Sequence, residues 1–205
     1  MTPAAAAPVF VLASGSAGRL RLLRTAGLDP DVVVSGVDEG HDGQLDTAGL
    51  VALLAERKAA AVARLRPDAL VLGCDSLLDL DGAPVGKPAS AEQAAGLWQR
   101  LAGRAATLCT GHCLIEPGGA RRVRDVARTT VRFGTPSAAE VAAYVATGEP
   151  LAMAGAFSID GRGAAFVEGI DGDPGTVIGL SLPLLRRMLA ELGVALTDLW
   201  QPHRA

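Results

Sequence analysis

The sequence predicts an α/β protein with a mixed, twisted sheet and two lobes around a central cleft. Short apolar runs at residues 9–13 and 69–74 are typical of buried strands, and leucines at helical spacing follow the first run. Predicted helices and strands then intermix without the strict alternation of an all-parallel sheet. With 205 residues, the chain can form one large core or two smaller ones beside a cleft.

The elements of the first half follow from apolar patterning and stop signals. Strands are predicted at residues 9–13, 31–35 and 69–74, and helices at residues 19–26 and 45–65. Ser16 fits the N-cap of the first helix, which Gly27 and Pro30 end. Pro67 stops the second, alanine- and leucine-rich helix.

The second half continues the pattern. Helices are predicted at residues 91–101, 137–147 and 183–192, and strands at residues 105–116 and 122–133. The turn at residues 117–119, Pro-Gly-Gly, joins the two strands, and Ser137 caps the middle helix. The glycine-rich residues 155–175 are expected to hold short strands.

Composition excludes several classes of function. The formal net charge is −3 and aromatic residues make up 3% of the chain, so we expect no stable nucleic-acid binding. The longest apolar runs are far shorter than a membrane span, and we expect no membrane association. Residues 1–17 carry no basic residue before their apolar stretch, unlike a signal peptide. We expect a cytoplasmic protein with a flexible tail at residues 1–8 and a single domain at residues 9–205.

The three cysteines fit a reducing compartment. Cys74, Cys109 and Cys113 are odd in number and form no Cys-x-x-Cys pair. Cys109 and Cys113 with His112 match a zinc site only in part. We expect these two cysteines to be small buried residues on one side of a strand.

The turn at residues 12–19 is the first candidate for chemistry. Its small residues, including Ser14 and Ser16, allow a ligand to approach the backbone closely, and the helix start that follows favours phosphate. Arg19 adds a planar cation suited to phosphate oxygens. A glycine-rich turn that only caps a helix fits the same residues.

Carboxylates supply the second candidate. Asp75 follows an apolar strand, and an Asp at the carboxyl end of a strand can hold Mg²⁺ or act as a general base. Capping of a turn is the alternative. Asp38 and Glu39 form an acidic pair that could bind a hard cation, although such pairs and a single helical lysine such as Lys58 usually face solvent.

Residues 82–88 invite comparison with a nucleotide-binding Walker A loop. The comparison fails because the glycine spacing is one residue short and Pro88 stands where Ser or Thr should bind magnesium. Lys87, between Gly86 and Pro88, still lies in a restricted loop and is either held toward a ligand or solvated.

Taken together, the motifs and their order resemble the Maf family of nucleoside triphosphate pyrophosphatases. The motifs are residues 12–23, residues 37–39, Lys58, and residues 73–76, 86–88, 144–150, 154–157, 172–174 and 177–180. The resemblance spans residues 9 to about 192 and implies a Maf/ITPase-like fold. It also implies hydrolysis of nucleoside triphosphates to monophosphate and pyrophosphate, a divalent cation (Mg²⁺, with Mn²⁺ as the other candidate) and a homodimer.

The resemblance also assigns roles to individual residues. Asp75 matches the family's catalytic carboxylate, which activates water. Arg19, Lys58 and Lys87 match its phosphate-binding cations, and the hydroxyls of Ser14 and Ser16 lie in the same phosphate loop. For the metal, the resemblance implies Glu39 together with Asp75.

Several positions depart from the family pattern. An arginine is replaced by Gly18, the Asp-Thr pair becomes Asp75-Ser76, which keeps a hydroxyl, and an asparagine becomes Thr176. A nucleotide-binding regulator of cell division with little catalysis is therefore an alternative. A Rossmann-type cofactor enzyme is disfavoured because the Gly-x-Gly-x-x-Gly pattern is absent.

Asp160 is the candidate for base recognition. Relatives that favour dTTP and UTP have Gln here, whose amide both accepts and donates, whereas an ionised Asp160 only accepts. A carboxylate suits guanine, with its adjacent donors at N1 and N2, and 7-methylguanine. Arg162 is a candidate for the missing donor, and a turn cap before Gly161 is the open alternative. Our hypothesis is that this protein is less selective for dTTP and UTP than the relatives that have Gln at this position.

Overall fold

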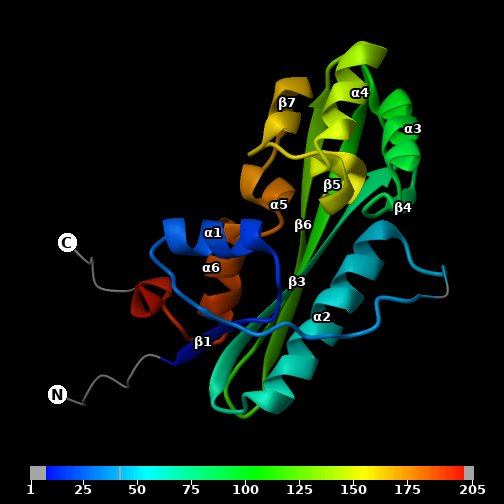
Figure 1. Ribbon diagram of the computed structural model, residues 1–205. Coiled ribbons are helices and arrows are strands. Elements are labelled where there is room, and N and C mark those ends of the chain that lie inside the picture. Colours follow the sequence, from blue (N-terminus) through cyan, green and yellow to red (C-terminus); the bar gives the residue numbers. More distant parts are fainter. Residues whose placement is uncertain (1–7, 42, 201–205) are drawn as a thin grey trace.

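One mixed sheet carries the fold of the chain, for which the computed structural model describes residues 8–41 and 43–200 (Figure 1). In this part of the chain the sheet has seven strands in the order β2-β1-β3-β5-β6-β7, with β4 beside the end of β3. The strands are β1 (Val9–Leu12), β2 (Asp31–Val32), β3 (Ala69–Leu80), β4 (Ala83–Val85), β5 (Ala105–Ile115), β6 (Arg122–Phe133) and β7 (Val167–Asp171). The pairs β1–β2 and β1–β3 are parallel and the others antiparallel. The predicted mixed α/β fold is confirmed.

Helices cover both faces of this sheet (Figure 1). They are α1 (Ala17–Thr25), α2 (Thr47–Leu65), α3 (Ala91–Leu101), α4 (Ala138–Ala146), α5 (Pro174–Ile178) and α6 (Leu182–Glu191). Short 3-10 turns are η1 (Glu149–Ala152), η2 (Ala154–Ala156), η3 (Arg162–Phe166) and η4 (Leu196–Leu199). The predicted caps Ser16 and Ser137 each accept a backbone N–H from the first turn of their helix.

The first lobe buries the two faces of β3 against different helices. Leu70 and Leu72 face a core shared with α1 and α6, whereas Val71, one residue along the strand, packs with Ala55 and Ala59 of α2. This follows from the alternation of side chains along a strand. The apolar run at residues 69–74 therefore marks a strand that is covered on both sides.

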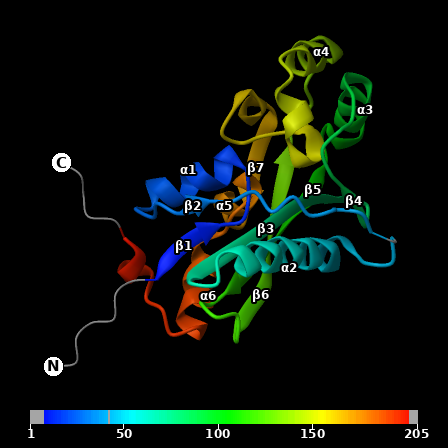
Figure 2. The same ribbon diagram turned by 60° about the horizontal axis from the view of Figure 1, so that its bottom comes forward.

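The second lobe has a separate aromatic core at the other end of the sheet, where α3 and α4 lie (Figure 2). Trp98 is fully buried there, packs edge-to-face against Phe133, Tyr144 and Phe166, and donates its indole N–H to the Ala156 carbonyl at 3.0 Å. Separate cores at the two ends of the long central strands give the two-lobed shape that the sequence predicts.

Two glycines allow α2 to lie unusually close to the sheet. A Cβ atom on Gly73 would lie 2.3 Å from the Ala55 carbonyl oxygen, and one on Gly111 would lie 2.2 Å from that of Val51. No side chain fits at either position, so glycine is required for this packing. The close approach places Lys58, on the same helix, beside the central strand.

Three local predictions were wrong or incomplete. The strand expected to end at Cys74 continues to Leu80, because β5 pairs with it as far as Asp79 and β4 pairs with Leu80. The second strand is only two residues long. Residues 155–175 hold 3-10 turns, a single strand and the start of α5, because 3-10 turns satisfy this segment's backbone groups locally. No helix in the described part of the chain is long and apolar enough to cross a membrane.

Candidate active site

A cleft of about 1000 Å³ lies between the two lobes. Its lining comes from the loop after β1, the start of α1, the loop at residues 34–41, α2, the middle of β3, the loop after β4 and residues 152–160. All eight predicted site residues line it: Ser14, Ser16, Arg19, Glu39, Lys58, Asp75, Lys87 and Asp160. The volume suits a ligand the size of a nucleotide.

The centre of the cleft is an edge of β3 that lacks a neighbouring strand. β1 pairs with β3 only as far as Leu72, and β4 begins to pair at Leu78. Between these points the described chain supplies no strand on this edge, although β5 pairs with the other edge throughout. Asp75 and Ser76 lie in this gap and point to opposite faces of the sheet. Asp75 therefore lies inside a strand, where we had expected it at a strand end.

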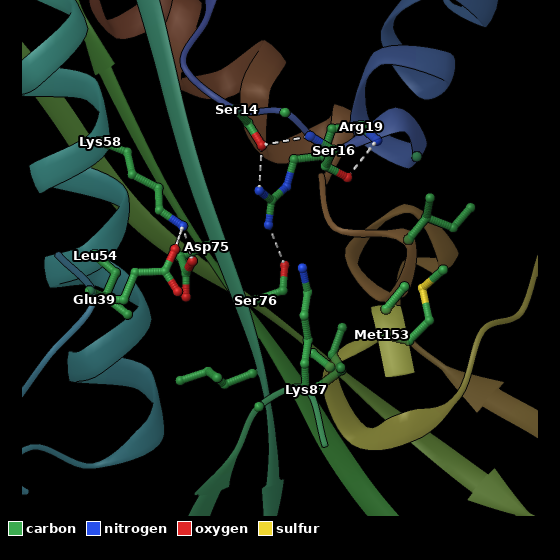
Figure 3. A pocket seen from close by; sticks show the side chains of 18 of the residues that line it. Ser14, Ser16, Arg19, Glu39, Leu54, Lys58, Asp75, Ser76, Lys87 and Met153 are labelled. Atoms are coloured by element: carbon green, nitrogen blue, oxygen red, sulfur yellow. Dashed lines mark hydrogen bonds and ion pairs between the residues drawn. The ribbon is translucent and has the colours of Figure 1, made fainter. Parts of the chain in front are cut away.

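Asp75 forms the first half of the site together with Lys58 and Glu39 (Figure 3). The Lys58 Nζ atom lies 2.5 Å from Asp75 Oδ1 and 2.6 Å from Glu39 Oε1. Asp75 is buried, and its burial raises the pKa of the carboxyl above the usual range, although Lys58 and Arg19 oppose this rise. Asp75 is therefore a stronger base than an exposed Asp, and Lys58 holds it in place.

Arg19 forms the second half, on the other face of β3 (Figure 3). Its guanidinium donates from Nη1 to Ser14 Oγ at 2.9 Å, from Nη2 to Ser76 Oγ at 2.9 Å and from Nε to the Gly179 carbonyl at 2.7 Å. Ser16 caps α1 by accepting the Arg19 backbone N–H at 3.4 Å. The guanidinium is thus rigidly held beside the N-terminus of a nine-residue helix, where an anion is favoured.

Lys87 enters the cleft from the second lobe (Figure 3). It follows β4, and within the described residues its ammonium has neither a hydrogen-bond acceptor nor an ion-pair partner. An exposed ammonium that faces a buried carboxylate and a fixed guanidinium across a cleft is available to a ligand with several negative charges.

Asp160 lies at the cleft wall and forms an ion pair with Arg21 of α1. Its side chain is 28% exposed, and that of Arg21 is 60% exposed. The pair joins the two lobes, since α1 belongs to the first and residues 158–161 to the second. Arg162, the donor suggested by the sequence, does not line the cleft and gives its backbone N–H to Glu149 at 3.0 Å.

Glu149 holds the loop that carries Asp160. Its Oε1 atom accepts hydrogen bonds from Ser158 Oγ at 2.7 Å, Tyr144 Oη at 3.0 Å and Gly163 N at 3.1 Å. Burial disfavours the charged carboxylate, but these donors and the N–H of Arg162 outweigh it and lower the pKa of Glu149 to about 2. The loop therefore stays ordered around an ionised carboxylate at neutral pH.

Apolar side chains also line the cleft. Those contributed by the chain segments of the second lobe and by α5 are Met153, Phe157, Ile159 and Val177. Apolar and aromatic side chains with one polar group at the edge are typical of a pocket for a flat organic ring. The cleft thus offers cationic groups that suit phosphates and apolar surface that suits a base.

The carboxylates of Glu39 and Asp75 fit a hard divalent cation. Both direct an oxygen at the same point, which the Lys58 ammonium occupies. The described residues contain no cluster of three His, Cys, Asp or Glu side chains suited to a metal. Two carboxylates are enough for Mg²⁺, which usually takes its remaining ligands from water and substrate phosphates.

The cysteines lie where we expected them. Cys109 and Cys113 are buried on the face of β5 that packs against α2, and both are free thiols. The His112 side chain points to the other face, where its Nε2 accepts the Ser181 N–H at 2.9 Å. His112 therefore does not join the cysteines.

Fold and site together define a two-lobed α/β protein whose cleft brings a buried carboxylate together with a fixed guanidinium and two ammonium groups. Comparison with known families agrees, because the family described as Maf-like protein matches residues 9–192. The chain therefore belongs to the Maf-like family.

Three relatives of high sequence identity support this assignment. A protein of Streptomyces avermitilis is 57% identical over 197 residues, covering 95% of each chain, and one of Streptomyces coelicolor is 58% identical, covering 94% of this chain and 95% of the other. A Mycobacterium protein is 50% identical, covering 93% and 97%. All three carry the name nucleoside triphosphate pyrophosphatase. Among solved structures, the Staphylococcus aureus Ham1 protein aligns with a TM-score of 0.46 and 16% identity, covering 89% and 94%.

The sequence missed two residues that contact predicted site residues. Ser76 was noted only as a retained hydroxyl, yet it holds Arg19. Arg21 carried no signal, because one more arginine in an arginine-rich helix is usually solvated. Its contact with Asp160 depends on the packing of one lobe against the other.

Proposed function

We propose that this chain hydrolyses nucleoside triphosphates to nucleoside monophosphate and pyrophosphate. The observation that carries the proposal is the buried Asp75, held by Lys58 in a cleft that Arg19 and Lys87 make cationic. Membership of the Maf-like family and the names of close relatives support it. The chain is an enzyme of the class that cleaves phosphoric anhydrides.

The chemistry follows from the placement of charges. A water molecule attacks the α-phosphorus, its proton passes to the Asp75 carboxylate, and the bond from phosphorus to the α,β-bridging oxygen breaks. The departing pyrophosphate takes the bonding electrons. Arg19, Lys87 and the N-terminus of α1 stabilise its negative charge, which is the main catalytic contribution that a protein makes to such a transfer. Ser14 and Ser16 hold the loop beside these phosphates.

The metal requirement belongs to the same proposal. Glu39 and Asp75 would hold Mg²⁺ or Mn²⁺, and Lys58 keeps their two carboxylates close together. When bound, the ion supplies positive charge to the phosphate oxygens. Asp75 keeps its role as proton acceptor in this scheme.

Asp160 contacts the base in our proposal, with Arg21 in place of Arg162 as the neighbouring donor. The pair presents an acceptor and a donor side by side at the cleft wall. A ring N–H can donate to Asp160 while a ring carbonyl accepts from Arg21. The donor that Asp160 lacks, compared with Gln, is thus close at hand.

The deciding experiment measures product formation by the purified protein. Incubation with Mg²⁺ and a panel of canonical and modified triphosphates should give monophosphate and pyrophosphate by ion-exchange chromatography. Diphosphate and orthophosphate as main products would contradict the proposed cleavage site. Tight nucleotide binding without any product would favour the alternative, a regulator with little catalysis, to which the loss of an arginine at Gly18 points.

We also propose that the enzyme is a cytoplasmic homodimer that binds neither nucleic acid nor membranes. The free, buried cysteines and the net charge of −3 are consistent with this assignment. Light scattering coupled to size-exclusion chromatography measures the mass in solution. A monomer at assay concentration would remove the dimer from the proposal.

A further inference from the structure

Arg19 is a buried cation whose side-chain partners within the described chain are all uncharged. Its side chain reaches only two hydroxyls and one carbonyl, of Ser14, Ser76 and Gly179, and the residue is 8% exposed. Buried charges are usually paired, so this one is left available to an anionic ligand. Three of its five N–H groups are used, which leaves one on each terminal nitrogen for phosphate oxygens.

The hydroxyl that holds Arg19 depends on a second hydroxyl behind it. Ser76 Oγ lies 2.9 Å from Thr110 Oγ1, and Thr110 Oγ1 lies 2.8 Å from the Thr176 carbonyl oxygen. A carbonyl only accepts, so the Thr110 proton points to Thr176, and Thr110 must accept the proton of Ser76. The lone pairs of Ser76 are then directed to Arg19, which only donates. The donors in this chain of hydrogen bonds are therefore fixed. Arg19 donates to Ser76, Ser76 donates to Thr110, and Thr110 donates to the Thr176 carbonyl.

Two side chains on the same face of β5 hold the segment whose Gly179 carbonyl binds Arg19. Thr110 is bonded to Thr176, and His112, two residues along the strand, accepts the Ser181 N–H at 2.9 Å. Gly179 lies between these two attachment points, and its carbonyl takes the Arg19 Nε–H. The His112 ring is neutral in this arrangement, with its proton on Nδ1 donated to the Thr110 carbonyl at 3.0 Å.

We propose that Thr110 is a positioning residue for Arg19. It is fully buried and does not line the cleft, so it acts on the substrate only through Ser76 and the segment that carries Gly179. It fixes the orientation in which the guanidinium meets the phosphates. The inference rests on the proposed function, because phosphate binding is the role given to Arg19.

The test replaces Thr110 with Val, which has nearly the same shape but no hydroxyl. We expect kcat/KM for a good triphosphate substrate to fall about 10- to 100-fold, because a small misplacement of a phosphate-binding group has effects of this size. The Thr110→Ser variant keeps the hydroxyl and should recover most of the activity. Affinity for tripolyphosphate, measured by calorimetry, should fall in the Val variant and recover in the Ser variant.

Thr129→Val is the matched control. Thr129 is also a buried threonine, and its hydroxyl donates to the Asp173 carbonyl at 3.0 Å, in the same segment of chain, but it has no bond to Ser76. Both Val variants lose one hydrogen bond to that segment and should lose similar thermal stability. Only Thr110→Val should lose activity.

A double-mutant cycle separates positioning from general damage. In an Arg19→Gln background, Thr110→Val should lower kcat/KM and tripolyphosphate affinity by less than about twofold, because its effect passes through Arg19. An equal loss in both backgrounds, or equal activity of the Thr110→Val and Thr129→Val variants, would overturn the inference. If Thr110→Val does not fold, Thr110→Ala replaces it. A wild-type protein that releases no pyrophosphate would instead overturn the proposed function. The affinities of the variants for tripolyphosphate would then be the test of the role of Thr110.

Discussion

The ammonium of Lys58 lies between the carboxylates of Asp75 and Glu39, 2.5 Å from the first and 2.6 Å from the second. The three groups come from α2, β3 and the loop after β2, so the contact joins three separate segments of the first lobe. Lys58 and Asp75 are largely buried, whereas the Glu39 side chain is 62% exposed. We infer that Asp75 is the fixed member of the group and that Glu39 can move when a ligand enters.

Asp75→Asn should nearly abolish turnover while the fold persists. The substitution keeps the size of the side chain but removes the proton acceptor, and general base catalysis alone contributes roughly 100- to 10,000-fold. Burial raises the pKa of Asp75, which means that the ionised carboxylate opposes folding at neutral pH. The melting temperature should therefore be unchanged or higher, as measured by calorimetry beside the rate of pyrophosphate release. A folded variant with a near-normal rate would remove Asp75 from catalysis.

Lys87→Met should lower kcat/KM by about 10-fold or more, because the transition state loses one of its charge-stabilising groups. The fold should not change, since the ammonium is exposed and has no partner within the described residues. The rate of pyrophosphate release at several substrate concentrations measures the effect.

Arg64→Met is the matched control for the lysine variant. Arg64 is an exposed cation near the end of α2 and lies outside the cleft lining. It should have normal kcat/KM. Similar losses in the two variants would indicate that net charge, rather than the position of Lys87 in the cleft, causes the effect.

Protonation of His112 should make the fold sensitive to mild acid. Burial lowers the pKa of His112 from 6.5 to about 4, and the nearby positive charge of Arg19 acts in the same direction. The unfolded state therefore binds this proton first, so the His112 contribution is complete above pH 6.5 and is lost as the pH falls toward 4. The difference corresponds to about 3 kcal/mol in the free energy of unfolding.

Urea unfolding between pH 7 and 4.5 measures this dependence. His112→Gln does not titrate, so its free energy of unfolding should fall less steeply with acid than that of the wild type. Parallel curves for the two proteins would show that other groups, such as the carboxylates, cause the loss.

The sequence predicted β1, α1, α2 and the start of β3 well because their burial is locally encoded. The apolar residues 69–72 of β3 are buried on both faces of the sheet. Ser16 caps α1 through a hydrogen bond from the backbone N–H of Arg19, only three residues further along the chain. The sequence did not predict the full length of β3. Residues 75–79 contain two aspartates, and they pair with β5, which is distant in the chain.

The sequence predicted the site only in part, because its motifs are local whereas its supporting contacts join distant segments. Motif resemblance brought together eight residues that do share one cleft, although their roles stay predictions. The supporting contacts were not predictable: Thr110 lies in an ordinary strand sequence, and its link to Ser76 spans 34 residues. A hydroxyl in a strand gives no sign of which neighbour it will meet until the register of the sheet is known.

With Asp160 and Arg21 at the cleft wall, the wild type should prefer dTTP and UTP less than a protein with glutamine at position 160. In the wild type, Asp160 accepts from a ring N–H while its partner Arg21 can donate to a ring carbonyl, an arrangement that suits guanine as well as thymine and uracil. Asp160→Gln removes the charge and the ion pair and places a donor and an acceptor on one side chain. The ratio of kcat/KM for dTTP or UTP to that for GTP should therefore rise about 10-fold, the effect of roughly one hydrogen bond.

The measurement compares kcat/KM for dTTP, UTP, GTP and 7-methyl-GTP in the wild type and in Asp160→Gln. The cationic ring of 7-methyl-GTP should lose most from the substitution, because the carboxylate that attracts it is gone. Asp29→Gln is the control: Asp29 also pairs with an arginine of α1, Arg24, at 2.8 Å, but it lies outside the cleft, so its substrate ratios should equal those of the wild type. A strong wild-type preference for dTTP and UTP that persists in Asp160→Gln would contradict the role of Asp160 in base selection and leave it as a contact between the lobes.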